Sequence, residues 1–303
     1  MSTVTALRQR HQLKDRLAKL AFVLPAGIAM LLLFGYPIVQ NLIMSLQAYD
    51  LRTFFTGAAP WVGLANYATV INDRIFSRAL INTALFTAGS LVFQFAIGMA
   101  LAVFFKNRFP LAPTLRALLL LPWLLPLIVS SATWRSILEA DSGILNRSLR
   151  AIGIIDDPIP WLASPSVALI SVIMVNIWVG IPFNVTLLYG GLQDIPDELY
   201  EAGALDGATG WRAFWQITWP NLRAVVGVVL VLGVVYTLKV LDIILGLTGG
   251  GPANATQTLA TVAYQRSFVE FEFGQGAALS NILIVIALLF AAFYLWRTRK
   301  EAQ

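Results

Sequence analysis

The sequence contains no cysteine and a single histidine, His11, and only 12% of its 303 residues are charged. Soluble globular proteins carry about 25% charged residues, so this composition argues against a soluble protein. Without cysteine there is no disulfide scaffold, and His11 alone supplies neither a His/Cys metal site nor a histidine-based catalytic triad. None of the five lysines follows the glycine pattern of a nucleotide-binding P-loop. We therefore expect no metal site, no cofactor and no ATP site on this chain.

Apolar residues make up 58% of the chain, and the mean hydropathy is +0.74. A helix needs about 20 predominantly apolar residues to cross the hydrocarbon core of a bilayer. Long uncharged runs predict six such helices, near 20–45, 79–105, 115–137, 166–191, 222–247 and 276–296. The first run is too long for a cleaved signal peptide, so we expect it to be retained. The predicted fold class is an all-α, polytopic membrane protein, with one domain at 20–297 between tails at 1–19 and 298–303.

The distribution of basic residues predicts the orientation. The two tails and the loops at 106–116 and 192–223 share one side of the membrane and hold 13 of the 21 Lys and Arg residues, whereas the other side holds 7. Basic loops stay in the cytoplasm, so both termini are predicted to be cytoplasmic. The net charge of +5 is therefore a topology signal and does not predict nucleic-acid binding.

A polar loop at 192–221 stands out between the fourth and fifth apolar runs. Asp194 can cap a helix that has Pro196 in its first turn, and Gly207 suits the end of that helix. A second short helix with several aromatic residues follows. Two short helices joined at a glycine must pack either beneath their own bundle or in a groove of a cytoplasmic partner.

The spacing within this loop resembles a known family. Glu-Ala-Gly at 201–203, Gly207, and Ile-Thr-Trp-Pro at 217–220 are similar to the EAA loop of binding-protein-dependent ABC importer permeases. That loop reads EAA, three residues, Gly, nine residues, then Ile-x-Leu-Pro. Glycine replaces the third-position alanine, and tryptophan replaces the leucine. The run Leu-Thr-Gly-Gly-Gly-Pro at 247–252 resembles carbohydrate permeases of the maltose and glycerol-phosphate type, in particular the first permease of their heterodimeric pair. The resemblance covers roughly 15–300.

This resemblance implies a type I ABC importer permease fold in a bacterial cytoplasmic (inner) membrane. It also implies the partners: a second permease chain, two ATPase subunits that bind ATP and Mg, an extracytoplasmic solute-binding protein and a sugar substrate. The residues that it assigns to ATPase coupling are Glu201, Ala202, Gly203, Asp206, Gly207, Trp211, Phe214, Ile217 and Pro220.

The resemblance also implies a role for most of these residues. Glu201 pairs with a basic residue of the ATPase, and Ala202 and Gly203 allow close helix approach. Asp206 caps the second short helix, and Pro220 starts the next span. The aromatic residues are left as either groove contacts or bundle packing.

Polar and aromatic residues inside the apolar runs are candidates for the substrate pathway. These are Asn82, Gln94, Asn176, Trp178, Asn184, Tyr236, Lys239, Asp242 and Asn281. Buried amides more often join helices than bind ligands. Lys239 and Asp242 stand three apart, on one face of the predicted fifth helix, either as pathway or subunit contacts or as a self-neutralised pair. Pro122, Pro126 and Pro182 are expected to kink the third and fourth spans, which favours these spans as pathway walls.

Other functions stay open at this point. Glycerol phosphate or a polyol derivative is an alternative substrate, but a phosphorylated ligand favours basic residues in the pathway, and only Lys239 is available. An ion-coupled secondary transporter predicts inverted repeats, which we do not find. A membrane enzyme lacks a nucleophile and base cluster here. Neither of these two alternatives requires the EAA-like loop.

Overall fold

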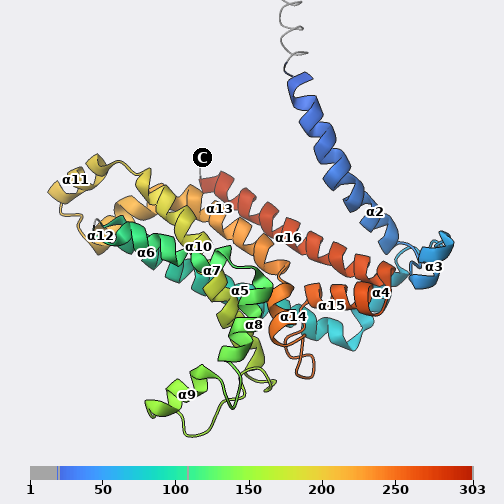
Figure 1. Ribbon diagram of the computed structural model, residues 1–303. Coiled ribbons are helices and arrows are strands. Elements are labelled where there is room, and N and C mark those ends of the chain that lie inside the picture. The colour runs from blue at the N-terminus through green and yellow to red at the C-terminus, as the bar shows by residue number, and fades with distance from the viewer. Residues whose placement is uncertain (1–18, 20, 108, 302–303) are drawn as a thin grey trace, which may run out of the picture.

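The computed structural model describes residues 19, 21–107 and 109–301, which form helices joined by loops (Figure 1). Its elements are η1 (Leu31–Gly35), α2 (Tyr36–Ser45), α3 (Leu51–Thr56), α4 (Ala65–Asn72), α5 (Arg74–Lys106), α6 (Ala112–Leu119), α7 (Leu121–Leu124), α8 (Leu127–Ile137), α9 (Ile144–Ala151), α10 (Ala168–Gln193), α11 (Asp197–Leu205), α12 (Trp211–Ala213), η2 (Phe214–Thr218), α13 (Trp219–Leu238), α14 (Asp242–Leu247), α15 (Leu259–Tyr264), η3 (Gln265–Val269) and α16 (Phe273–Glu301). The predicted tails at 1–19 and 298–303 lie outside the described residues, except for residue 19 and the backbone of 298–301. The all-α class is confirmed.

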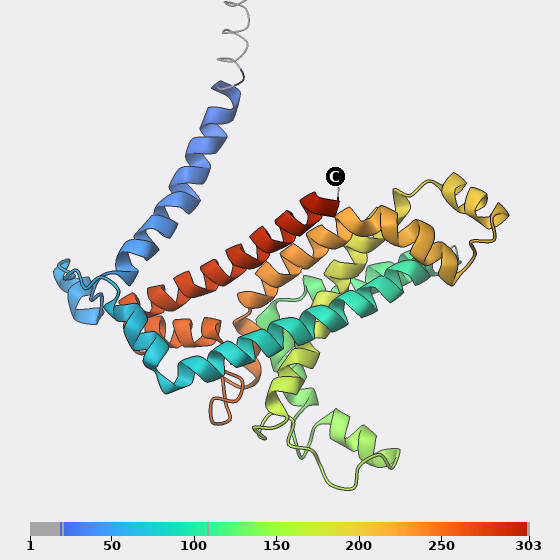
Figure 2. The ribbon, with the colours of Figure 1, turned by 180° about the vertical axis from the view of Figure 1, so that it is seen from behind.

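The first long helix, Ala21–Ser45, leans away from the other helices and meets them near its C-terminal end (Figures 1 and 2). At that end Asn41 Nδ2 donates a hydrogen bond to Asn281 Oδ1 at 2.7 Å, and the hydroxyls of Ser45 and Tyr67 lie 2.8 Å apart. Large apolar side chains along the rest of this helix are exposed. An apolar helix with so little packing needs lipid or another protein around it.

The centre of the bundle is the pair α5 and α10. The Asp73 side chain begins α5 by accepting a hydrogen bond from the Ile75 N–H at 2.9 Å, as an N-cap should. Farther along, Gly98 of α5 faces Asn184 of α10, and a Cβ added to Gly98 would stand 2.6 Å from Asn184 Cβ. The missing side chain therefore sets how closely these two backbones approach.

The third apolar run, predicted as one helix at 115–137, is instead bent sharply. Ala112–Leu124 and Leu127–Ile137 meet at 96°. Leu125 and Pro126 between them have extended backbone, with ψ of 138° and 132°. Proline disfavours a helical conformation in the preceding residue and cannot donate a backbone hydrogen bond, so it ends the helix here. The expected kink at Pro126 is large enough to separate two helices, whereas Pro182 lies within α10, which continues past it.

The fifth apolar run also differs from the prediction of a helix near 222–247. One helix runs from Trp211 to Leu238 through α12, η2 and α13. It breaks at 239–241, and α14 follows as a separate helix. Pro220 therefore lies inside a continuous helix and does not start one. The π-helical turn of η2 directly before it is the kind of local adjustment by which a helix accommodates proline.

The glycine-rich run after α14 folds back onto the bundle, as expected from its sequence. Asn82 Nδ2 of α5 donates hydrogen bonds to the carbonyls of Ala255 and Gln257 at 3.0 and 2.9 Å. The Leu259 N–H donates to Thr83 Oγ1 at 2.9 Å, and all of these groups are buried. This loop is thus held by α5 through specific polar contacts.

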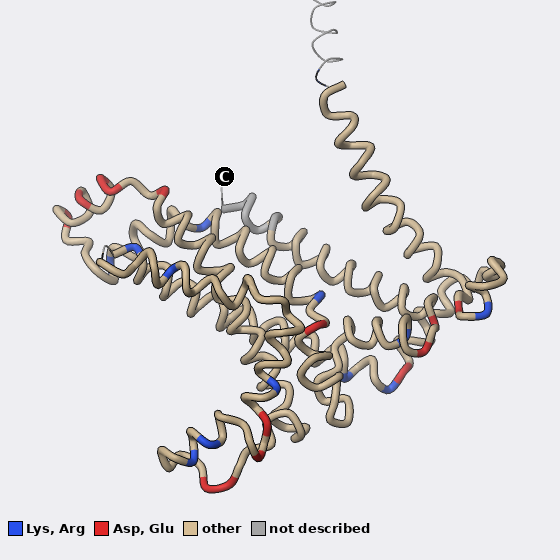
Figure 3. The backbone as a smooth tube through the Cα atoms, in the orientation of Figure 1, with Lys and Arg blue, Asp and Glu red and all other residues tan. Residues whose placement is uncertain are grey.

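Most charged residues lie toward the ends of the helices, and few lie in the middle of the bundle (Figure 3). In the described part of the chain, five helices are long and apolar enough to cross a membrane, and the bent pair makes a sixth candidate. This arrangement supports a multi-pass membrane protein with two polar ends. One end carries α11 and α12, and the other carries α9 and the glycine-rich loop (Figure 1).

Candidate functional site

The polar loop at 192–221 projects from one end of the bundle as α11, a turn and the start of the long helix Trp211–Leu238 (Figure 1). The turn uses Gly207 and Gly210, which have φ of +77° and +54°, values that glycine adopts without strain. Gly207 therefore bends the chain as predicted. The second short helix is not separate, because it continues into the fifth apolar helix.

The predicted capping roles in this loop are wrong. Pro196 occupies the N-cap position of α11, and Asp194 instead follows the last residue of α10. Asp206 follows α11 at its C-terminal end, while Gly210 precedes α12. Extended backbone at Pro196 and the loop turn at Gly210 begin these helices, so no side-chain cap is needed at either position.

A close contact joins the two halves of the loop. Gly203 of α11 lies against Ile217 of η2, where an added Cβ would stand 2.5 Å from Ile217 Cδ1. The Tyr200 and Thr218 hydroxyls lie 2.9 Å apart across the same interface. Gly203 thus permits the close approach that the motif implies. Sequence reasoning missed Tyr200 and Thr218, although Tyr200 stands next to the motif.

The outer surface of this loop is acidic and apolar at once. Glu201 and Asp206 are exposed, and within the described residues neither forms an ion pair. Leu205 is 91% exposed and Trp211 72% exposed. Phe214, by contrast, is half-buried against the bundle, stacked on Trp211 at a ring distance of 5.4 Å. The aromatic residues therefore divide: some pack on the bundle and others face outward.

A second candidate site is a cavity of about 510 Å³ inside the bundle. Five of the predicted pathway residues line it: Gln94 from α5, Asn176 from α10, Tyr236 from α13, Lys239 from the break, and Asp242 from α14. Gln94 Nε2 donates to the Asn176 carbonyl at 2.8 Å, which joins α5 and α10 at the cavity wall.

Aromatic rings form another part of the same wall. Phe183 meets Tyr236 edge-to-face at 5.5 Å and Trp123 at 6.0 Å. Lys239 Nζ lies 4.8 Å from the centre of the Tyr236 ring. Aromatic faces beside amide and hydroxyl groups suit a ligand with both apolar and polar surface. Trp123 and Phe183 were not among the predicted pathway residues. Their aromatic side chains within apolar runs were the only feature of the sequence that could have indicated them.

Lys239 and Asp242 do not share a helix face as predicted, because the helix ends before Lys239 and restarts at Asp242. Both side chains are exposed and line the cavity, and they form no ion pair with each other. The break between α13 and α14 falls where these two charged residues interrupt an apolar run. The structure therefore does not support a self-neutralised pair, and a role in the pathway stays a prediction.

The other four pathway candidates lie outside this cavity. Asn82 holds the glycine-rich loop, and Asn281 accepts the hydrogen bond from Asn41. Asn184 Nδ2 donates to the Gly180 carbonyl of its own helix at 3.0 Å, and Trp178 packs edge-to-face on a tryptophan of α8. Asn281 and Trp178 thus join neighbouring helices, Asn82 joins α5 to the loop, and the Asn184 hydrogen bond lies within α10.

Residues 85–300 match the family described as "Binding-protein-dependent transport system inner membrane component". The chain belongs to this family. The permease MalF of the trehalose/maltose transport system of Thermococcus litoralis is 34% identical over 286 residues, which cover 94% of this chain and 95% of that protein. The permease DasB of the diacetylchitobiose uptake system of Streptomyces coelicolor is 30% identical over 294 residues, which cover 95% of this chain and 88% of that protein. Membership confirms the prediction of a transport permease subunit rather than an enzyme.

Two further similarities agree with this assignment. The permease SmoG of the sulfoquinovosyl glycerol transport system of Agrobacterium fabrum is 31% identical, covering 93% of this chain and 91% of that one. The crystal structure of a bacterial ABC transporter that imports alginate contains a chain with the same fold, at a TM-score of 0.81 and 22% identity, covering 98% of this chain and all of that one. The predicted permease fold is confirmed.

Proposed function

We propose that this permease forms, together with a second permease chain, the pathway for ATP-driven uptake of a sugar or oligosaccharide. The observation that carries this proposal is the projecting EAA-like loop on a bundle whose cavity is lined by aromatic and amide groups. The named relatives, which belong to systems for trehalose and maltose, for diacetylchitobiose and for sulfoquinovosyl glycerol, support a carbohydrate substrate.

The cavity lining favours a neutral sugar over glycerol phosphate. Its charged side chains are one cation, Lys239, and one anion, Asp242. A phosphorylated ligand needs an excess of positive charge to compensate for its loss of hydration. The cavity offers no such excess. Its Trp, Phe and Tyr rings instead suit the apolar face of a sugar ring, and Gln94 and Asn176 suit hydroxyl groups.

A second permease chain is supported by the first helix. Ala21–Ser45 has exposed apolar side chains along most of its length and contacts its own bundle near one end. Lipid alone can cover such a helix, but its position away from the bundle leaves a wide apolar surface on both (Figures 1 and 2). A neighbouring permease chain would pack between them.

ATPase subunits would bind the end that carries α11. The exposed Glu201 is placed to pair with a basic residue of an ATPase groove, and the exposed Leu205 and Trp211 would supply apolar contacts there. The ATPases would bring ATP and Mg, because this chain has no P-loop. In this arrangement the loop end and both termini face the cytoplasm, in a bacterial inner membrane. A solute-binding protein would deliver the sugar to the opposite end, which carries α9 and the glycine-rich loop.

Gentle purification of the tagged chain from its native membrane, with mass spectrometry of the proteins that accompany it, tests the assembly. We expect an ATPase and a second permease. Glu201→Lys should reduce the recovered ATPase at least about tenfold, because it replaces one partner of an interfacial charge pair with a like charge. Glu198→Lys, on the same helix but outside the motif, is the matched control. Recovery of the folded chain alone, or full ATPase recovery with Glu201→Lys, would contradict this function.

A further inference from the structure

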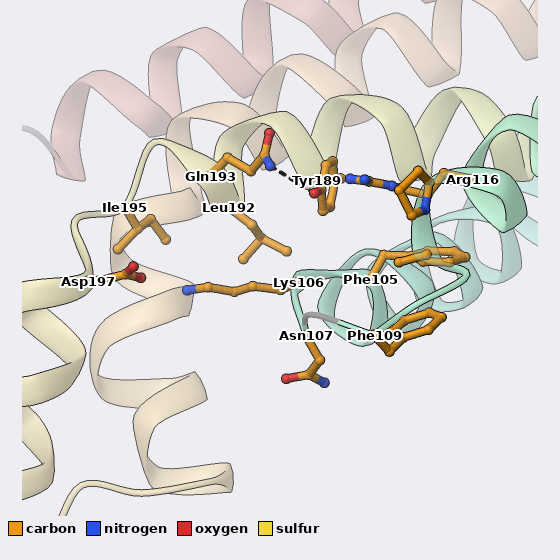
Figure 4. A pocket seen from close by; sticks show the side chains of 12 residues that line it. Phe105, Lys106, Asn107, Phe109, Arg116, Tyr189, Leu192, Gln193, Ile195 and Asp197 are labelled. Carbon is orange, nitrogen blue, oxygen red and sulfur yellow. Dashed lines mark hydrogen bonds between the residues drawn. The ribbon is translucent and has the colours of Figure 1, made fainter.

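A pocket distinct from the sugar cavity lies at the end of the bundle that carries α11 (Figure 4). Its volume is about 340 Å³. The C-terminal end of α5, the start of α6 and the junction between α10 and α11 form its walls. The pocket therefore lies at one polar end of the bundle, where α5 and α10 end and α6 begins.

Among the residues that the structure describes, two cations line this pocket, and both rest on tyrosine rings. Lys106 Nζ lies 3.5 Å from the centre of the Tyr200 ring, and the Arg116 guanidinium lies 4.4 Å from the centre of the Tyr189 ring. Gln193 Nε2 donates to the Tyr189 hydroxyl at 2.8 Å and so fixes that ring beneath Arg116. Each cation is thus held in place by an aromatic face.

Neither cation has an anionic partner in the described part of the chain, where the ion pairs all involve Arg266. The ammonium nitrogen of Lys106 is also buried and makes no hydrogen bond there. A buried ammonium without an acceptor is costly, so such groups are normally paired. Asp197 lines the same pocket but lies beyond ion-pair distance of both cations. The pocket therefore keeps a net positive charge and an unused buried donor.

We propose that this pocket binds the phosphate group of an anionic phospholipid. The guanidinium of Arg116 can bind two oxygens of a phosphodiester, and Lys106, which points toward Asp197 on another side of the pocket, adds a second positive charge to the wall (Figure 4). The rest of the wall includes Phe105, Phe109 and Leu192, which suit the glycerol and the first carbons of the acyl chains. Basic pockets between helix ends are typical sites for lipid headgroups.

A headgroup in this position would also affect the loop. Lys106 is the last residue of α5 and lies over Tyr200 of α11, whereas Arg116 of α6 lies over Tyr189 of α10. A phosphate bound near these cations would hold the end of α5 and the start of α6 in place, and these segments contact α11 and α10 through the two tyrosine rings. The inference goes beyond the proposed sugar uptake and does not depend on which sugar is carried.

The test uses the full chain, purified with its associated subunits and placed in phosphatidylcholine nanodiscs that contain increasing fractions of a photoactivatable phosphatidylglycerol. We expect crosslinks in the peptides that contain 105–116 and 189–197. Lys106→Gln and Arg116→Gln should each weaken labelling about fivefold, as expected for the loss of one cation near a lipid headgroup. Arg116→Lys, which keeps the charge, should retain most of the labelling. Arg223→Gln is the matched control, because Arg223 is exposed near the same end but outside the pocket.

Three results would overturn the proposal. The first is undiminished labelling in the Lys106→Gln, Arg116→Gln double variant. The second is an equal loss with Arg223→Gln, which would indicate unspecific attraction to the charged surface. The third is displacement of the lipid by millimolar inorganic phosphate, which would make the source a soluble phosphate. Gel filtration of each variant checks that loss of labelling does not reflect misfolding.

Discussion

Gly98 offers a sharp test of how α5 and α10 pack. A methyl group at this position would stand 2.6 Å from Asn184 Cβ, which is at least about 0.8 Å too close for ordinary contact. Asn184 Cβ is attached directly to the backbone of α10, so a rotamer change cannot move it away. Gly98→Ala must therefore push the two helices apart.

The magnitude follows from two opposing effects. Forcing an extra methyl group into a packed interface costs about 1–3 kcal/mol. Replacing glycine by alanine within a helix gains about 1 kcal/mol. The difference is about 0–2 kcal/mol, and we expect Gly98→Ala to lower the free energy of unfolding by an amount in the upper half of this range, because Asn184 Cβ cannot move aside. On the scale of proteins of about 150–250 residues, each kcal/mol corresponds to about 2–4 °C in Tm.

Gly190→Ala is the matched control, because Gly190 lies on the partner helix with nothing within 4 Å of an added Cβ. This control should raise the Tm, since it keeps the helix gain without the clash. Thermal unfolding of the purified chain, followed by tryptophan fluorescence, measures both variants side by side. A Tm for Gly98→Ala equal to or above the natural protein would refute the close packing of α5 and α10.

Two further predictions concern the opposite end of the bundle. Thr83→Val should destabilise the chain by about 1–3 kcal/mol, because the buried N–H of Leu259 loses its acceptor; a Thr83→Ser variant should keep its Tm, and equal losses in both would contradict this role. The Ser142 hydroxyl and N–H donate to the Glu139 carboxylate and hold the pKa of Glu139 below its ordinary value. This contact therefore stabilises the fold above the ordinary carboxyl pKa, and the stabilisation is lost as the pH falls through the lowered pKa. Ser142→Ala should raise the pKa of Glu139, measured by NMR titration of labelled glutamate; an unchanged titration midpoint would exclude the contact.

The motif spacing predicted the turn and the close packing of the loop at 192–221 because several local requirements coincide there. Gly207 must adopt a positive φ, and Gly203 must leave room for Ile217. Such requirements restrict the residue type at each position, so they can be read from a single sequence. The prediction of side-chain caps at Asp194 and Asp206 was wrong because capping restricts the residue type much less. Several backbone conformations can begin or end a helix without a side-chain cap.

Helix breaks inside apolar runs were harder to predict. Apolar residues continue on both sides of the bend at Pro126 and of the gap at 239–241, so hydropathy alone predicts a single helix in each case. Pro126 ends a helix while Pro182 does not, and tertiary packing decides between them. For a similar reason, only some of the predicted pathway residues line the cavity. Their residue types alone could not distinguish Gln94 at the cavity from Asn82 beneath the outer loop.

The unbroken helix Trp211–Leu238 has a mechanical consequence. It joins the exposed aromatic end of the loop to Tyr236 in the cavity wall as a rod of about 42 Å, at 1.5 Å of rise per residue. A tilt of about 10° around its midpoint would move each end by about 4 Å. A displacement of the loop end would thus be transmitted to the cavity wall at Tyr236. The gap at 239–241 would allow this helix to tilt while α14 stays packed against α8.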